Sequence, residues 1–447
     1  MNPPEQFLPL TETVTPADPA AVAETVRGAW QSGTPVYPIG GGTALHYGVR
    51  PTRPGLGLSL ARLNRVIDYP ARDLTITVEA GATIAEVAGR LASERQRLPV
   101  DIPQADLATV GGAVATDPSG PRRYLWRTLR DYVIGIQAVD GRGTAFSGGG
   151  RVVKNAAGYN LCRLLTGSLG TLGVITQVTL MVKPLPETSA LLARDVSDLA
   201  TAEKLLADLV HTQTLPAAID FLVGPAWEDD PALSRQSASA AGRLVVGFEG
   251  TSAEVDWMLE HLGSDWRGST GVSAAEIRGD ASARVWDRLT QFPAPAPGAD
   301  GAGRGVRNLL CVAPSGPFRQ KVPDPFSCIV VEIGVLPSAT VDFVRLLLEV
   351  DPDCSIQAHA GDGILRVRFA RDPAEAAAVL GGRLRPAVAA AGGSMVVLSC
   401  PVAVSLSRND VWGPDTNGAK VMQSIKSGFD PKGILNPGRF SYPNPYP

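Results

Sequence analysis

The sequence has little of what a metal-binding or a nucleic-acid-binding protein needs. Its 447 residues include only four histidines and five scattered cysteines, and no two cysteines form a Cys-x-x-Cys pair. Any iron–sulfur cluster or structural zinc would therefore take its ligands from another chain. The 41 lysines and arginines nearly balance the 44 aspartates and glutamates, which gives a net charge of -3. Such a balance provides no general attraction to phosphate backbones, so we expect no nucleic-acid partner.

Long apolar runs are also missing. No stretch approaches the roughly 20 apolar residues that a membrane-spanning helix requires, and residues 1–10 lack the basic start and apolar run of a secretory leader. We therefore expect a cytoplasmic protein without a transmembrane segment. Glycine and proline, by contrast, are abundant at 48 and 37 residues, which predicts many tight loops. The length allows two or three domains.

Short helices and strands alternate in the first part of the chain. Apolar residues at helical spacing predict a helix over residues 18–31, with Asp18 as its N-cap. Thr83 and Glu86 have the spacing of a capping box at the start of another helix. The Asp140-Gly141 pair between two alternating runs predicts a β-hairpin. This mixture predicts an α+β fold, and the Pro184-Leu185-Pro186 run marks a domain boundary.

Three glycine-rich stretches stand out before that boundary: residues 40–42, 111–120 and 148–173. Any one of them could be only a tight turn with positive φ. Together they suit a ligand that approaches the main chain closely, because exposed N–H groups form a concavity for a diphosphate. The spaced Gly-x-Gly-x-x-Gly pattern and the Walker loop are both absent, so the stretches predict a dinucleotide site of another type.

A set of motifs distributed along the chain carries a resemblance to a known family. The motifs are Pro38–Thr43, Val78–Gly81, Gly111–Gly120, Arg130-Asp131, Val153–Asn160, Gly170–Thr176 and Asp430–Gly438. In this combination the chain resembles the FAD-binding (PCMH-type) oxidoreductases of the vanillyl-alcohol-oxidase family. Within that family it is most similar to the FAD-binding subunits of bacterial glycolate oxidases.

The resemblance implies an α+β fold with three parts. Residues 1–187 would form a PCMH-type FAD-binding domain of two subdomains, and residues 188–400 an α+β cap or substrate domain. Residues 401–447 would return to the flavin domain.

The resemblance also implies which residues contact FAD. The first set, at the pyrophosphate, is Pro38, Ile39, Gly40, Gly41, Gly42 and Thr43. The second set, along the diphosphate and ribityl chain, is Thr109, Gly111, Gly112, Ala115, Thr116 and Ser119. The third set, at the adenine end, is Gly170, Gly173, Val174 and Ile175. Asn436 would be a contact on the flavin side, although an Asn-Pro turn explains this residue equally well.

Some relatives attach the flavin covalently through a histidine in the first glycine loop. That loop has no histidine or cysteine here, and His46 follows only after Thr43, Ala44 and Leu45. We therefore expect noncovalent FAD.

Oxidation of a 2-hydroxy acid requires a base, a cation for the carboxylate and a flavin placed to accept hydride. His359 lies in a His-Ala-Gly-Asp-Gly stretch similar to the His-x-Gly-Asp-Gly stretch of catalytic hydroxy-acid dehydrogenases, and it is our candidate base. Arg366 could hold the carboxylate, although Arg366 and Arg368 could equally be two solvated arginines. Those dehydrogenases continue with Asn and a second His, whereas this chain continues with Ile364-Leu365-Arg366, so a divalent metal lacks ligands.

Three hypotheses follow. In the first, the chain is the FAD-binding subunit of a complex that oxidises a small 2-hydroxy acid. It would work with a catalytic flavoprotein subunit and an iron–sulfur subunit, and would reach the inner membrane only through such partners. In the second, it is a stand-alone dehydrogenase of a small hydroxy acid or sugar acid with His359 as base. In the third, it is a structural subunit with an empty flavin pocket. The missing metal ligands favour the first over the second.

Overall fold

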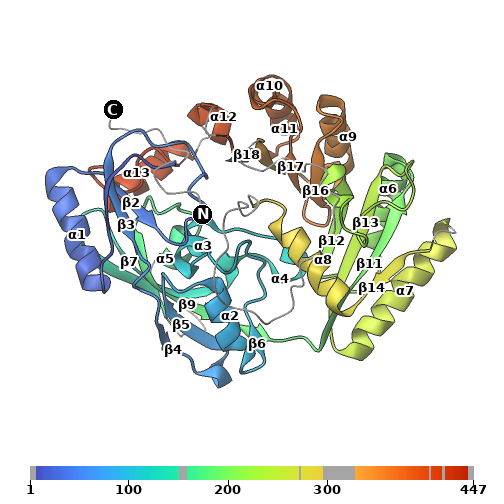
Figure 1. Cartoon of the computed structure of the whole chain (residues 1–447), viewed down its shortest axis with the longest axis horizontal. Helices are drawn as coiled ribbons and strands as arrows, with labels where there is room; N and C mark the ends of the chain where they lie inside the picture. Colours follow the sequence, from blue (N-terminus) through green and yellow to red (C-terminus); the bar gives the residue numbers. More distant parts are fainter. Residues whose placement is uncertain are drawn as a thin grey trace. The chain divides into compact units, whose positions relative to one another are not determined.

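Short helices and strands alternate through the computed structural model, which describes residues 7–150, 159–270, 273–294, 328–401, 404–414 and 418–440 (Figure 1). The α+β fold class is confirmed. Residues 151–158, which carry part of the resemblance, lie outside the described residues. The cysteines that the structure describes are Cys162, Cys328, Cys354 and Cys400, and all four are free thiols.

The chain divides into two compact units. The first contains residues 1–119, 127–185 and 406–447, and the second contains residues 120–126 and 186–405. The end of the chain is therefore part of the first unit. We predicted residues 120–126 as part of the first domain, but they belong to the second unit. There, Arg122 Nε and Trp126 Nε1 both donate to the buried carboxylate of Glu249.

The first unit contains two main sheets. A three-stranded parallel sheet has the order β1-β3-β2, and a five-stranded antiparallel sheet has the order β4-β5-β9-β7-β8. The strands are β1 (Leu10–Val14), β2 (Val36–Ile39), β3 (Gly55–Ser59), β4 (Val66–Asp68), β5 (Thr75–Glu79), β7 (Val133–Val139), β8 (Ala145–Gly149) and β9 (Val174–Met181), with β6 (Gln96–Arg97) pairing with β10 (Lys183–Pro184).

One apolar core holds the first unit together. Apolar side chains from both sheets, from the helices and from the tail at Ile434 and Leu435 meet in it. The helices are α1 (Pro19–Ser32), α2 (Ile84–Ala92), α3 (Val110–Thr116), α5 (Leu161–Leu165), α12 (Arg408–Trp412) and α13 (Ala419–Phe429). Because the tail supplies buried side chains, it is an integral part of this unit.

Three local predictions in the first unit are confirmed. Asp18 caps α1 by accepting a hydrogen bond from Ala21 N at 2.9 Å. Thr83 and Glu86 form both hydrogen bonds of a capping box at the start of α2. Strands β7 and β8 form the predicted hairpin around Asp140-Gly141.

The second unit is built on one eight-stranded antiparallel sheet with the order β14-β11-β13-β12-β16-β17-β15-β18. Its strands are β11 (Thr188–Val196), β12 (Ala218–Val223), β13 (Gly242–Gly250), β14 (Ala275–Ile277), β15 (Val330–Gly334), β16 (Ser355–His359), β17 (Ile364–Arg368) and β18 (Ser394–Ser399). Its helices are α4 (Arg123–Trp126), α6 (Leu199–Leu209), α7 (Ser252–Thr270), α8 (Gly279–Gln291), α9 (Thr340–Val350), α10 (Pro373–Val379) and α11 (Arg385–Ala390).

Helices lie on both faces of this sheet. Helices α6 and α7 lie on one side of the sheet and α8 on the other (Figure 1). On the α8 side, Trp286 packs against Gly247, where any Cβ would lie only 2.3 Å from the indole ring. Because side chains alternate along strands, the same face carries Asp220, Gln357 and His359. Arg366 pairs with Gln357, so this face holds both candidate catalytic residues, His359 and Arg366.

Membrane insertion through a helix finds no support in the described part of the chain. No helix there combines the length and the apolar character needed to cross a bilayer.

Candidate functional site

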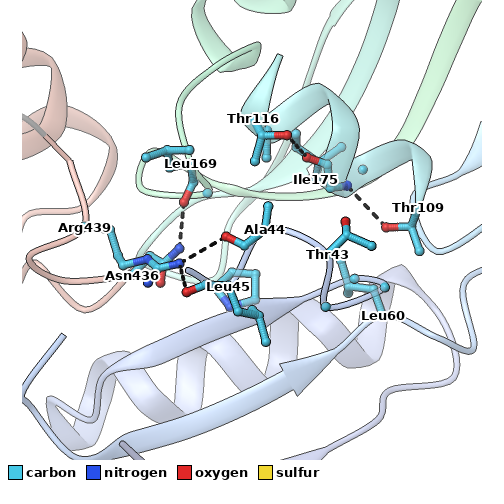
Figure 2. A pocket seen from close by; sticks show the side chains of 18 of the residues that line it. Thr43, Ala44, Leu45, Leu60, Thr109, Thr116, Leu169, Ile175, Asn436 and Arg439 are labelled. Carbon is cyan, nitrogen blue, oxygen red and sulfur yellow. Dashed lines mark hydrogen bonds between the residues drawn. The ribbon is translucent and has the colours of Figure 1, made fainter. Parts of the chain in front are cut away.

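Four segments that are far apart in the sequence line one pocket in the first unit. They are the loop after β2, the start of α3, the loop before β9 and the tail at Asn436 and Arg439 (Figure 2). The space between these walls is partly open to solvent. The three glycine-rich stretches therefore share one cavity.

The loop after β2 needs its glycines for two different reasons. A Cβ on Gly41 would lie 1.5 Å from the backbone oxygen of Leu107, so only glycine lets the two segments come this close. Gly42 has φ +76°, a left-handed conformation that glycine adopts without strain. Both features turn the backbone of Gly40–Thr43 toward the pocket without side chains in between.

Helix α3 begins at the pocket. Thr109 is its N-cap and accepts a hydrogen bond from Gly112 N at 3.3 Å. The hydroxyl of Thr116 donates to Gly112 O at 2.9 Å and so turns back onto its own helix. The lining positions on this helix are Gly111, Gly112, Ala115 and Thr116, all of them small. The wall formed by α3 is thus mostly main chain.

The tail of the chain closes the pocket from another side. Asn436 has φ +45°, its backbone N donates to Val36 O, and its Nδ2 donates to Leu169 O at 2.6 Å (Figure 2). Asn436 therefore both makes the turn that we considered and lines the pocket. Its side chain fixes the loop that carries Gly170.

Arg439 is the single charged side chain among the residues that line this pocket. Its Nη2 donates to Leu45 O at 2.8 Å and lies 3.5 Å from Ala44 O, which holds the turn after Thr43. Burial lowers the pKa of Arg439 to about 10, so the guanidinium remains charged at neutral pH. Its buried Nε has no hydrogen-bond partner among the described residues. A positive charge with an unused donor therefore lies in the wall.

His46 follows Leu45 in the chain and is half-buried. It packs edge-on against the rings of Phe7 and Tyr47. Burial, with a smaller effect of the Arg439 charge, lowers the pKa of His46 to about 3. The imidazole is therefore neutral at physiological pH, and it is not among the residues that line the pocket.

Most of the residues that we assigned to FAD line this pocket. They are Pro38, Gly40, Gly41, Gly42, Thr43, Thr109, Gly111, Gly112, Ala115, Thr116, Gly170, Gly173, Ile175 and Asn436. Ile39, Ser119 and Val174 do not line it. Since neighbouring strand residues point to opposite faces, Ile39 and Val174 are directed away from the pocket when Pro38 and Ile175 line it. Ser119 is buried.

Sequence reasoning missed six residues that line this pocket: Leu8, Ala44, Leu45, Leu60, Leu169 and Arg439. The apolar ones carry no signal that distinguishes them from core residues. Arg439 follows Asn436-Pro437-Gly438 directly, so its place in the tail motif was the available signal.

A second group of polar residues lies in the second unit around His359. Its Nδ1 is 2.6 Å from Asp220 Oδ1, and its Nε2 is 3.2 Å from Nη1 of Arg366. Arg366 Nε also donates to Glu332 Oε2 at 3.0 Å. His359, Asp220 and Arg366 are all at least 97% buried. The two candidate catalytic residues are thus in direct contact with each other.

Arg368 has another environment. It lies on the same face of β17, but its guanidinium donates to the backbone oxygens of Phe292 and Ala294. Within the described residues no group of three or more His, Cys, Asp or Glu side chains is placed to hold a metal ion. The absence of ligands for a divalent metal stays a prediction.

Two known protein families match separate segments of this chain. The family described as "FAD binding domain" matches residues 11–149, and the family described as "FAD linked oxidases, C-terminal domain" matches residues 412–440. The chain is an FAD-linked oxidoreductase. The two matched segments include the loop after β2, α3, Asn436 and Arg439, so they carry most of the pocket wall.

Several characterised proteins are similar to this oxidoreductase. Glycolate oxidase subunit GlcD of Bacillus subtilis is 26% identical over 413 residues, covering 91% of this chain and 83% of that protein. D-lactate dehydrogenase of Archaeoglobus fulgidus is 27% identical over 448 residues, covering 95% and 90%. Glycolate oxidase subunit GlcE of Escherichia coli is 34% identical over 205 residues, covering only 45% and 56%.

The oxidoreductase also has a similar solved structure. An alkyldihydroxyacetonephosphate synthase superimposes with a TM-score of 0.65 at 18% identity, covering 96% of this chain and 77% of the other. At this level of identity the likeness establishes the fold.

Proposed function

We propose that this oxidoreductase is an FAD-dependent dehydrogenase of a small 2-hydroxy acid and acts as the FAD-binding subunit of a glycolate-oxidase-like complex. The observation that carries the proposal is a pocket of glycine-rich backbone in a chain whose relatives GlcD and D-lactate dehydrogenase match it over more than nine-tenths of its length. Both relatives are named for small 2-hydroxy acids. GlcE is also named as a subunit of a glycolate oxidase, which supports membership of a complex.

The residues of the pocket fit FAD. A wall of backbone and small side chains admits a diphosphate closely, and the Arg439 guanidinium offsets its negative charge. When bound, FAD supplies the acceptor for the hydride that leaves the substrate carbon. The chain itself would hold the diphosphate on the Gly40–Thr43 backbone and at the start of α3, with Gly170–Ile175 at the adenine end. No lining side chain is a histidine or cysteine, which supports noncovalent binding.

The alternative of a stand-alone dehydrogenase requires His359 to act as a base. A base needs a free lone pair within reach of the substrate hydroxyl. The Nε2 lone pair of His359 accepts a hydrogen bond from Arg366, and Nδ1 faces Asp220. Since both ring nitrogens are engaged, the arrangement favours the subunit of a complex over the stand-alone enzyme. The remaining alternative is a structural subunit with an empty flavin pocket. The matches of this chain to the FAD-binding and FAD-linked oxidase families disfavour it.

The test uses the full-length chain, alone and with its co-expressed partners. We expect the isolated chain to bind FAD and to release it intact on acid treatment, as noncovalent flavin does. Anaerobic glycolate or D-lactate should bleach the flavin only in the assembled complex. A chain that takes up no FAD would refute the cofactor site. Rapid bleaching in the isolated chain, lost in His359→Ala, would establish the stand-alone dehydrogenase instead.

Assembly forms a separate part of the proposal. We propose a cytoplasmic protein that binds a catalytic flavoprotein subunit and an iron–sulfur subunit, and that approaches the inner membrane only through them. Purification of a tagged chain with its untagged genomic neighbours tests this. The expected result is a stable complex that contains iron and more than one flavin. Recovery of the chain without any partner would count against complex membership.

A further inference from the structure

The protonation state of His359 follows from its partners. A guanidinium has only N–H donors and no acceptor, so Nε2 of His359 must accept the hydrogen bond from Arg366 at 3.2 Å. The ring proton is then on Nδ1 and is donated to Asp220 Oδ1 at 2.6 Å. His359 is therefore a neutral imidazole with both nitrogens in use.

Asp220 orients this imidazole in a defined way. Its second oxygen, Oδ2, accepts from Gln357 Nε2 at 3.1 Å, and the same Nε2 donates to Leu289 O at 3.0 Å. The carboxylate is thus fixed on both oxygens. An imidazole whose Nδ1–H is bonded to a fixed carboxylate is the usual arrangement of a metal-binding histidine, with Nε2 directed at the cation.

In this chain the cation that His359 Nε2 faces is the guanidinium of Arg366. The Arg366 guanidinium lies between His359 Nε2 and the Glu332 carboxylate, bonded to each through a different nitrogen. An imidazole nitrogen and a carboxylate oxygen are ligands that divalent metals use. Strand register fixes the arginine there, because Arg366 on β17 pairs with Gln357 on β16 and with Glu332 on β15.

We propose that the guanidinium of Arg366 is a built-in cation that takes the position of a divalent metal between His359 and Glu332. It makes this polar cluster independent of metal ions and keeps the His359 lone pair occupied. In this role Arg366 is a positioning residue for His359. The inference concerns the cluster alone and holds for any substrate.

The first test is on the wild-type protein, full length and reconstituted with FAD. Nitrogen-15 NMR of labelled histidines has only four side chains to resolve, and His359→Gln identifies the signal of His359. We expect a neutral ring with the proton on Nδ1, unchanged by an excess of Zn²⁺. A Zn²⁺-dependent shift of the His359 signal, or a neutral ring with the proton on Nε2, would overturn the proposal.

The second test changes the cation. Arg366→His removes the guanidinium and adds an imidazole next to His359 and Glu332, whereas Arg368→His makes the same change two residues along the same strand face. We expect Arg366→His to bind Co²⁺ with a visible ligand-field spectrum, at least about tenfold more tightly than Arg368→His. EDTA should remove the spectrum. Equal Co²⁺ binding by the two variants would contradict the proposal.

Both readouts are independent of activity. Failure of the chain to oxidise any hydroxy acid would refute the proposed function and leave this inference standing. If Arg366→His does not fold, the NMR measurement on the wild-type protein still decides the question.

Discussion

Lys426 and Asp430 form a buried ion pair one helical turn apart at the end of α13. Nζ of Lys426 donates to the Asp430 carboxylate and also to the backbone oxygens of Thr171 at 2.7 Å and Leu435 at 3.1 Å. The carboxylate accepts in turn from the backbone N of Ile434 and of Leu435. The pair thus connects the tail to the loop before β9, and Asn436 follows directly.

Removal of one partner of this ion pair should weaken the contact between the tail and the loop before β9. Asp430→Asn leaves the buried ammonium of Lys426 without its counter-charge, so we expect the first unit to lose about 3–5 kcal/mol of stability. FAD affinity should fall as well, because Asn436 and Arg439 depend on the tail. Urea unfolding monitored by flavin fluorescence measures both. The exposed Lys432→Met serves as the control, with less than about 1 kcal/mol expected. Equal effects of the two changes would show that the buried pair has no special role.

Two glycines of the pocket should respond differently to substitution. In Gly41→Ala the new Cβ meets the backbone oxygen of Leu107, so we expect about 2 kcal/mol or more of lost stability. Gly112 is the third residue of α3, where a glutamate can complete a capping box with Thr109. Gly112→Glu should therefore fold normally.

The same Gly112→Glu change should abolish FAD binding. A carboxylate at this lining position repels the diphosphate, so we expect at least about a hundredfold weaker FAD, close to 3 kcal/mol. Fluorescence titration of the apoprotein measures the affinity, and Gly112→Ala separates the effect of size from that of charge. Unchanged affinity in Gly112→Glu would mean that the diphosphate binds elsewhere.

The parts of the fold that were predictable from sequence are those with local causes. Asp18 and the Thr83–Glu86 box mark helix starts because the capping atoms lie within three residues of each other. The placement of residues 120–126 was not predictable in this way. It depends on Glu249, which lies more than 120 residues along the chain from Arg122 and Trp126.

The glycine-rich part of the candidate site was predictable from the sequence, because glycine has no side chain to cover the backbone. Glycines reveal where backbone faces a ligand, so the three loops were found together. Arg439 was missed because an arginine after a Pro-Gly pair is ordinarily solvated, and its burial depends on Ala44 and Leu45. The contact between His359 and Arg366 was missed because it requires the register of β16 on β17.

Arg439 offers a direct test of the charge in the pocket wall. Arg439→Met removes the guanidinium and leaves the backbone oxygen of Leu45 without its donor, so we expect FAD affinity to fall at least about tenfold, or 1.4 kcal/mol. Arg142→Met, at a half-exposed arginine that donates to Gly428 O, should leave the affinity unchanged. Equilibrium dialysis of FAD compares the two. Equal affinities would remove Arg439 from the cofactor site.

Glu249 should control the position of residues 120–126 in the second unit. Glu249→Gln weakens the bonds to Arg122 Nε at 2.6 Å and to Trp126 Nε1 at 3.0 Å. We expect about 2 kcal/mol of lost stability and faster trypsin cleavage after Arg122 and Arg123. Mass spectrometry of the fragments locates the cuts. Glu260→Gln, at an exposed position on α7, should cleave like the wild type, and matching cleavage rates would refute the anchoring role.

The lowered pKa of the half-buried His46 should make stability depend on pH. Its pKa is about 3 in the folded protein and about 6.5 when unfolded. Between these two pH values the imidazole is protonated only in the unfolded state. The contribution of neutral His46 to the free energy of unfolding is therefore fully present above pH 6.5 and is lost as the pH falls toward 3. At pH 5 the loss should reach about 2 kcal/mol. His46→Gln should flatten the profile between pH 7.5 and 5 in chemical denaturation experiments. A variant with the wild-type slope would show that other groups cause the acid sensitivity.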